Sequence, residues 1–158
     1  MNNSKISMRL SKLNDLPEMQ KMFVDTISTI CIDDYTPEQI KVWTSSIENI
    51  QRWIDKLTSQ YFLIAELDNK IVGYASLENN DYVDFLYVHK DFQRQDNNDR
   101  LYTEIENEAI KRKVTILTSD VSETARRFFE KKGFKTIAPQ TNIIKNVEIV
   151  NYKMTKQL

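Results

Sequence analysis

The chain has 158 residues, of which 41% are hydrophobic and 28% are charged, so it is long enough for one domain with a buried core. Its formal net charge is −1, which provides no overall attraction to nucleic acid or to an anionic membrane surface. The N-terminus, MNNSKISMRL, is too polar for a signal peptide, and no apolar run reaches about 18 residues. We therefore expect a single domain over residues 1–158 without nucleic-acid or membrane partners.

Cysteine and glycine are both scarce. Cys31 is the single cysteine, so no intramolecular disulfide can form, and a reducing cytoplasm is the expected location. Only two residues are glycine, so turns that need positive φ angles must use mainly Asn and Asp.

The first sixty residues predict one strand and three helices. Alternating apolar residues predict a strand over 5–11. Asn14 or Asp15 then caps a helix with Pro17 in its first turn, and Thr36 caps a second helix that starts at Pro37. A further helical pattern covers residues 50–57.

Three strands in succession follow, at 61–67, 70–78 and 82–89, joined by short turns rich in Asn and Asp. A helical pattern near 99–112 leads into a short strand at 114–118. Ser122 can cap the next helix, which Gly133 ends, and residues 147–154 form a plausible final strand.

Four segments of this pattern match a known family: the strand FLYVHKDFQRQ, the loop QDNND, the helix SETARRFFEKKGF and the tail NVEIVNYKM. In these segments the chain resembles the bacterial branch of the GNAT superfamily of acetyl-CoA-dependent N-acetyltransferases. The resemblance implies an α/β fold with a mixed, twisted sheet, helices on both faces and the element order β-α-α-β-β-β-α-β-α-β. It also implies that the chain transfers acetyl from acetyl-CoA to an amine of a small molecule or protein.

The loop before the helix near 99–112 departs from the family pattern. GNAT proteins usually carry Gln or Arg, two spacers, Gly, one spacer, then Gly or Ala, and this loop holds the cofactor pyrophosphate. The aligned residues here contain no glycine: Gln93, Arg94, Gln95, Asp96, Asn97 and Asn98. Asp96 and Asp99 also add negative charge, which Arg94, Arg100 or Arg126 could offset. Two alternatives stay open: the loop binds the cofactor, or the two aspartates cap the helix and fill the anion site.

The resemblance further assigns the backbone of Leu86, Tyr87 and Val88 to the pantetheine arm of the cofactor. The expected cofactor-binding residues are therefore Leu86, Tyr87, Val88, Gln93, Arg94, Gln95, Asp96, Asn97, Asn98, Asp99, Arg100, Ser122, Arg126 and Phe129.

Asp84 is the candidate general base, because an ammonium acceptor must lose a proton before its amine attacks the thioester. On a regular strand, residues 82, 84, 86 and 88 share one face and 83, 85, 87 and 89 share the other. Val83 and Phe85 flank Asp84 in sequence, and loss of hydration there would make its carboxylate a stronger base. The alternative is a structural Asp84 that is bonded to Tyr74 or to a backbone N–H.

A general acid is harder to identify. Phe129 stands where many relatives have a tyrosine that protonates the departing thiolate. Tyr87 and Tyr152 are candidate substitutes by residue type only, and a thiolate needs little help to leave. No metal is expected, because His89 is the single histidine and no second His or Cys lies at ligand spacing.

The acceptor pocket of relatives is built from the first helices, where Trp43 and Trp53 are either pocket or core residues. The alternative function is a GNAT-like binding module that has lost turnover. The acceptor stays unnamed, and the chain is expected to be a monomer or a homodimer.

Overall fold

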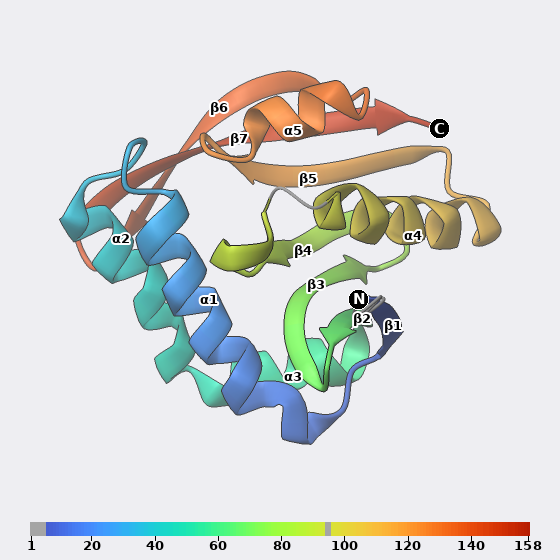
Figure 1. The fold of residues 1–158 in the computed structure, drawn as a ribbon. Helices are drawn as coiled ribbons and strands as arrows, with labels where there is room; N and C mark the ends of the chain where they lie inside the picture. The colour runs from blue at the N-terminus through green and yellow to red at the C-terminus, as the bar shows by residue number, and fades with distance from the viewer. Residues whose placement is uncertain (1–5, 94–95) are drawn as a thin grey trace.

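The computed structural model describes residues 6–93 and 96–158, and its centre is a seven-stranded mixed sheet (Figure 1). The strands lie in the order β1-β2-β3-β4-β5-β7-β6, and every neighbouring pair is antiparallel except β4 and β5. Their bounds are β1 Ser7–Leu10, β2 Tyr61–Leu67, β3 Lys70–Glu78, β4 Tyr82–Val88, β5 Ile116–Ser122, β6 Lys135–Ile144 and β7 Val147–Gln157.

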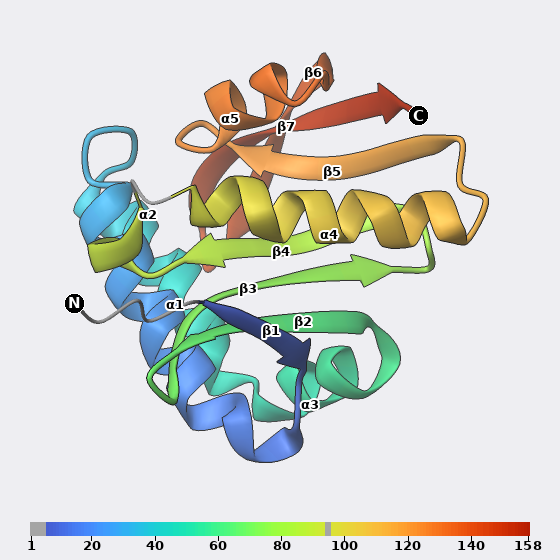
Figure 2. The ribbon, with the colours of Figure 1, turned by 45° about the vertical axis from the view of Figure 1, so that its right-hand side comes forward.

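Helices cover both faces of the sheet, as Figures 1 and 2 show. One face packs against α1, α2 and α3 through a core that includes Met19, Trp53 and Tyr74. The other face packs against α4 and α5 through Leu101, Ile105 and Phe129, among others. The helix bounds are α1 Leu16–Ile30, α2 Pro37–Thr44, α3 Ile50–Ser59, α4 Asn97–Lys111 and α5 Arg126–Lys131.

The expected α/β fold is confirmed, and the element order differs in two places. A third helix, α3, precedes β2, as the periodicity of 50–57 indicated. Strand β6 is absent from the expected order. It pairs only with β7, most of its residues are exposed, and it contains Pro139. A proline and little burial are typical of an edge strand, which carries no strong hydrophobic pattern.

The tight turns use asparagine and aspartate in place of glycine, as expected. Among the described residues, eight that are not glycine have positive φ angles. Six of these eight are Asn or Asp: Asp68, Asn69, Asn79, Asn80, Asp96 and Asn146. Both central residues of the β2–β3 turn have positive φ, which gives the turn the twist that a hairpin needs.

Strand β4 contains a β-bulge that overturns the expected alternation of its side chains. Leu77 is opposite Val83, whereas Ala75 is opposite Leu86, so Asp84 and Phe85 together face the single residue Ser76. The Ser76 hydroxyl accepts a hydrogen bond from the N–H of Phe85 at 3.1 Å. As a result, Asp84 and Phe85 both contact the face covered by α1–α3, and Asp84 does not share the face of Leu86.

Within residues 6–93 and 96–158, no helix is both long enough and apolar enough to cross a membrane.

Candidate active site

The two central strands separate from each other along their length. Tyr82 and Thr118 form the register pair between β4 and β5, and the Thr118 N–H donates to the Asp81 carbonyl at 2.9 Å. One residue further along, the link is a side chain: the Ser119 hydroxyl donates to the Val83 carbonyl at 2.8 Å. Because β4 and β5 are parallel and their register pair, Tyr82 and Thr118, lies toward their amino-terminal ends, their carboxyl ends leave a cleft between them.

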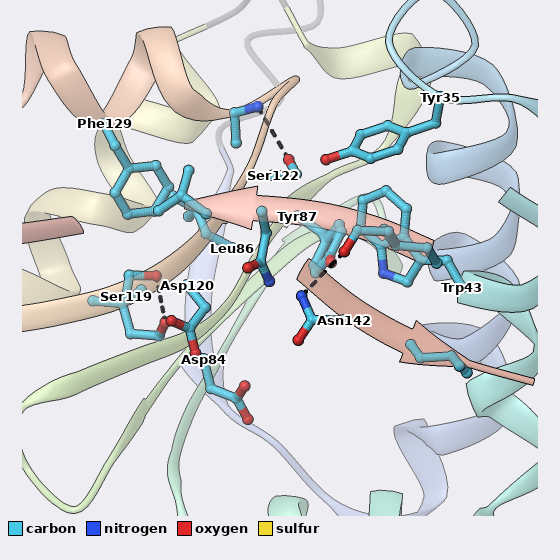
Figure 3. Close-up of a pocket in the computed structure, with 16 residues that line it drawn as sticks. Tyr35, Trp43, Asp84, Leu86, Tyr87, Ser119, Asp120, Ser122, Phe129 and Asn142 are labelled. Atoms are coloured by element: carbon cyan, nitrogen blue, oxygen red, sulfur yellow. Dashed lines mark hydrogen bonds between the residues drawn. The ribbon is translucent and has the colours of Figure 1, made fainter. Parts of the chain in front are cut away.

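Two adjoining cavities, of about 270 and 140 Å³, occupy this cleft. Figure 3 shows the larger of these two, with side chains from β4, β5, β6, α2 and α5 around it. The two cavities share six lining residues: Trp43, Leu86, Tyr87, Ser122, Ala125 and Phe129. The cleft therefore runs continuously from the start of α4 and α5 toward the helices on the opposite face.

The register of β4 leaves backbone groups directed into this cleft. His89 is opposite Val72 and its N–H donates to the Val72 carbonyl at 2.8 Å, so Tyr87 and Tyr74 also form a hydrogen-bonded pair. Leu86 and Val88 alternate with these pairs, so their N–H and C=O groups are directed away from β3 and toward β5. The Val88 carbonyl accepts a hydrogen bond from the Gln93 side-chain amide.

Asp84 is held by two donors from α3 and the residue that follows it. The Lys56 ammonium lies 2.6 Å from Oδ2, and Nε2 of Gln60 donates to the same oxygen at 2.8 Å. Asp84 therefore lies in an ion pair and not in the apolar surroundings that we expected. Its side chain is 15% exposed. The suggested Tyr74 partner is wrong, because the Tyr74 hydroxyl donates to the Met19 carbonyl. Since both donors use Oδ2, Oδ1 is the oxygen that they leave to other partners.

Of the two candidate tyrosines, only Tyr87 lines the cleft. Its ring packs against Phe23 and Phe85, and burial raises the pKa of its hydroxyl far above the ordinary value. Tyr152 lines neither cavity, and its ring lies 4.1 Å from the Arg126 guanidinium. Its hydrogen bond with Glu123 is the main cause that raises its pKa.

The start of α5 differs from expectation. Ser122 is the last residue of β5 and not the N-cap of α5, which is Ala125. The Ser122 hydroxyl still accepts a hydrogen bond from the Ala125 N–H at 3.1 Å, and both residues line the cleft. Phe129, one turn along α5, is 4% exposed and lines both cavities, but it has no proton to donate.

The start of α4 does not show the self-capping that the two aspartates suggested. Asp96 is the N-cap in a left-handed conformation, φ 57°, and its side chain makes no capping hydrogen bond. The Asp99 carboxylate pairs with the Lys132 ammonium instead. Asn97 is buried, with its amide donating to the Phe92 carbonyl at 3.0 Å, while Asn98 and Gln93 line the smaller cavity. Arg94 and Gln95 lie outside the described residues.

The other two arginines expected near the phosphates have other partners. Arg100 donates to the Ile6 carbonyl at 3.1 Å. Arg126 lies 3.8 Å from the Glu123 carboxylate and 3.4 Å from that of Glu130. Neither residue lines the cleft cavities. The cation that offsets Asp99 is Lys132, which sequence reasoning missed.

A third cavity of about 550 Å³ continues the cleft toward α3. Trp53, a core residue that is 3% exposed, lines it. It shares six lining residues with the cavity of about 270 Å³: Trp43, Asp84, Tyr87, Asp120, Ile144 and Asn151. The polar residues of the cleft that sequence reasoning missed include Tyr35, Lys56, Tyr82, Ser119, Asp120, Asn142 and Asn151.

Tyr35 has a structural part in the cleft wall. Its hydroxyl donates to the Val150 carbonyl at 2.9 Å and accepts from the Glu123 N–H at 2.8 Å, and burial raises its pKa to about 12. His89 accepts a hydrogen bond from the Asp91 N–H through Nδ1. In the described part of the chain, no group of three or more His, Cys, Asp or Glu side chains is arranged to hold a metal ion.

Comparisons with known proteins agree with this geometry. The sequence profile of the acetyltransferase (GNAT) domain matches residues 31–156. The uncharacterized N-acetyltransferase YafP of Escherichia coli K12 is 27% identical over 154 residues, which are 98% of this chain and 96% of YafP.

Two solved structures share the fold over nearly their full lengths. A GCN5-related N-acetyltransferase from Rhodopseudomonas palustris has a TM-score of 0.93 and 34% identity, covering 100% of this chain and 99% of that one. The PaiA N-acetyltransferase of Thermoplasma acidophilum, solved in complex with coenzyme A, has a TM-score of 0.77 and 19% identity, covering 98% and 99%. The profile match over most of the chain and the likeness to the Rhodopseudomonas palustris structure show that this protein belongs to the GNAT family of acetyltransferases.

Proposed function

We propose that the chain is one N-acetyltransferase domain that transfers acetyl from acetyl-CoA to an amine of a small molecule or protein. The observation that carries the proposal is the divergence of β4 from β5. It directs the backbone groups of Leu86 and Val88 into a cleft that also contains Asp84. Extended amide-containing ligands bind such an open strand edge by main-chain hydrogen bonds, and the pantetheine arm is a ligand of this kind.

The start of α4 is the proposed site for the pyrophosphate. Helix N-termini bind anions through free N–H groups and the helix dipole, and the Asp96 side chain does not occupy these groups. Lys132 neutralises Asp99, which removes one of the two charges that oppose a phosphate. The coenzyme A found in the structure of the Thermoplasma acidophilum relative supports the same ligand for this fold.

Asp84 is the proposed general base for direct attack. Its carboxylate takes a proton from the acceptor ammonium, and the free amine then forms the new C–N bond as the C–S bond breaks. Lys56 holds Asp84 in place through Oδ2. Tyr87 lies in the cleft with its hydroxyl protonated, so it is the proposed proton relay: it gives its proton to the leaving thiolate and takes the second proton that the acceptor nitrogen releases as the amide forms.

Thiol release tests the proposal directly. The purified protein is incubated with acetyl-CoA and a panel of primary amines, and release of the free thiol is followed over time. We expect steady amine-dependent release together with acetylated amine. Binding of acetyl-CoA by calorimetry without any turnover would instead identify a binding module that has lost catalysis.

Asp96→Gly should strengthen acetyl-CoA binding about five- to hundredfold. A carboxylate about 5 Å from a phosphate costs about 1–3 kcal/mol at intermediate dielectric, and glycine removes this charge. Glycine also adopts the left-handed conformation without the cost of about 1–2 kcal/mol that other residues incur, so the free energy of unfolding should rise. Calorimetry and thermal unfolding measure the two effects.

Asp68→Gly is the matched control for Asp96→Gly. Asp68 also has a positive φ, 50°, in the β2–β3 turn, and it lines none of the three cleft cavities. It should gain stability without any change in acetyl-CoA affinity. Equal or weaker binding by Asp96→Gly would show that Asp96 does not oppose the phosphates.

A further inference from the structure

Two carboxylates lie on opposite sides of the gap between the central strands. Asp84 belongs to β4 and Asp120 to β5, and both line the larger cleft cavity and the third cavity. The proposed cofactor site lies at the start of α4. The third cavity lies on the α3 side, so it is the part of the cleft that remains for an acceptor. The two carboxylates differ in how their charge is balanced.

The charge of Asp84 is already neutralised within the protein. Lys56 pairs with it at 2.6 Å, and both side chains are mostly buried. An incoming ammonium would have to compete with this resident ammonium for the same carboxylate. Asp84 alone is therefore a poor first contact for a cationic acceptor.

Asp120, in contrast, has only neutral donors. The Tyr82 hydroxyl donates to Oδ2 and the Gln140 amide donates to Oδ1, each at 2.7 Å. Tyr82 stays protonated, because burial and this hydrogen bond raise its pKa. Lys153 lies opposite Asp120 in the β5–β7 register, yet no ion pair within 4.0 Å joins Asp120 to any cation of the described residues. Asp120 therefore gives this end of the cleft an exposed negative charge.

The other cations and the aromatic walls of the third cavity are also compatible with a cationic ligand beside Asp120. Lys145 pairs with Glu48 at 3.4 Å, and Arg52 lies on the exposed side of α3. Trp43 and Tyr87 supply aromatic surface beside the two carboxylates. Aromatic faces attract alkyl cations and pack against apolar carbon, so they favour an ammonium group with hydrocarbon next to it.

We propose that Asp120 is a specificity-determining residue that binds the acceptor as an alkyl ammonium. The acceptor class is then a basic alkyl amine with apolar carbon beside the nitrogen, and not an arylamine, which is uncharged at neutral pH. This inference rests on the proposed acetyltransferase function. In it, Asp120 binds and orients the ammonium, and Asp84 accepts the proton.

Asp120→Asn tests the assignment with benzylamine, an alkyl ammonium, and aniline, its neutral aryl counterpart. The wild-type protein should have the lower KM for benzylamine. In the variant this KM should rise about ten- to hundredfold, which is the usual effect of losing one charge-assisted contact, while kcat changes less than threefold. The KM for aniline and the Kd for acetyl-CoA should stay within twofold. Added salt should raise the benzylamine KM in the wild type but not in the variant.

Asp55→Asn is the matched control, because it removes the same charge from an exposed residue of α3 that lines none of the three cleft cavities. It should leave every constant unchanged. Unchanged benzylamine KM in a folded Asp120→Asn protein, or equal use of aniline by the wild type, overturns the inference while the acetyltransferase function stands. Failure of the wild type to consume acetyl-CoA with any amine overturns both.

Discussion

Asp84→Asn should lower kcat by about 10²–10⁴, with the Kd for acetyl-CoA unchanged within about threefold. Asparagine has the shape of aspartate, and its side-chain oxygen can still accept from Lys56 and Gln60. It cannot take a proton from the acceptor. Steady-state kinetics and calorimetry with acetyl-CoA measure these effects.

The same substitution leaves the mostly buried Lys56 ammonium without its counter-charge, so a loss of stability of about 1–3 kcal/mol is expected. Thermal unfolding must therefore accompany the kinetics. Asp81→Asn is the control, because Asp81 is exposed and precedes β4 without lining the cleft. Near-normal turnover by a folded Asp84→Asn protein would exclude Asp84 as the base. Failure of the variant to fold would identify Asp84 as a structural residue.

Elements with local signals could be predicted from the sequence. Thr36 and Pro37 predict the start of α2, and the structure shows a capping box at this position. Strands β2 and β3 have the expected bounds, because short polar turns interrupt two apolar runs. Strand β6 could not be found in this way, since its exposed residues and Pro139 give no alternation of apolar and polar positions.

The site was predictable only where the chain carries it on one segment. Leu86, Tyr87 and Val88 lie together on β4 and line the cleft, and Phe129 joins them from α5; their part in cofactor binding stays a prediction. The partner of Asp84 was not predictable, because Lys56 lies 28 residues earlier, on a helix whose polar side has several charged residues. The bulge opposite Ser76 depends on the register with β3, so a single strand pattern cannot reveal it.

Asp120 was missed for a related reason. No pattern in the sequence around Asp120 marks it as a site residue. Its two hydrogen-bond donors, Tyr82 and Gln140, come from two other strands. Sites assembled across several strands depend on the sheet order, and here that order includes the strand that the sequence did not indicate.

Ala125→Trp should weaken acetyl-CoA binding at least a hundredfold and abolish turnover. Ala125 lines both cleft cavities at the start of α5, and an indole group would fill much of the smaller cavity of about 140 Å³. The pantetheine arm would then lose the space beside Leu86 and Val88. The fold should tolerate the change, because the side chain is half-exposed and enters space that no protein atom occupies. Calorimetry, thiol release and thermal unfolding measure the three effects.

Ala138→Trp is the matched control for this steric block. Ala138 is exposed on β6, outside all three cavities, so the same substitution there should leave acetyl-CoA affinity and turnover unchanged. A drop in both variants would indicate a general effect of the added indole. Wild-type affinity in a folded Ala125→Trp protein would mean that acetyl-CoA does not enter between β4 and β5. In that case the divergence of these strands could no longer support the proposed function, whatever the response of Asp84→Asn.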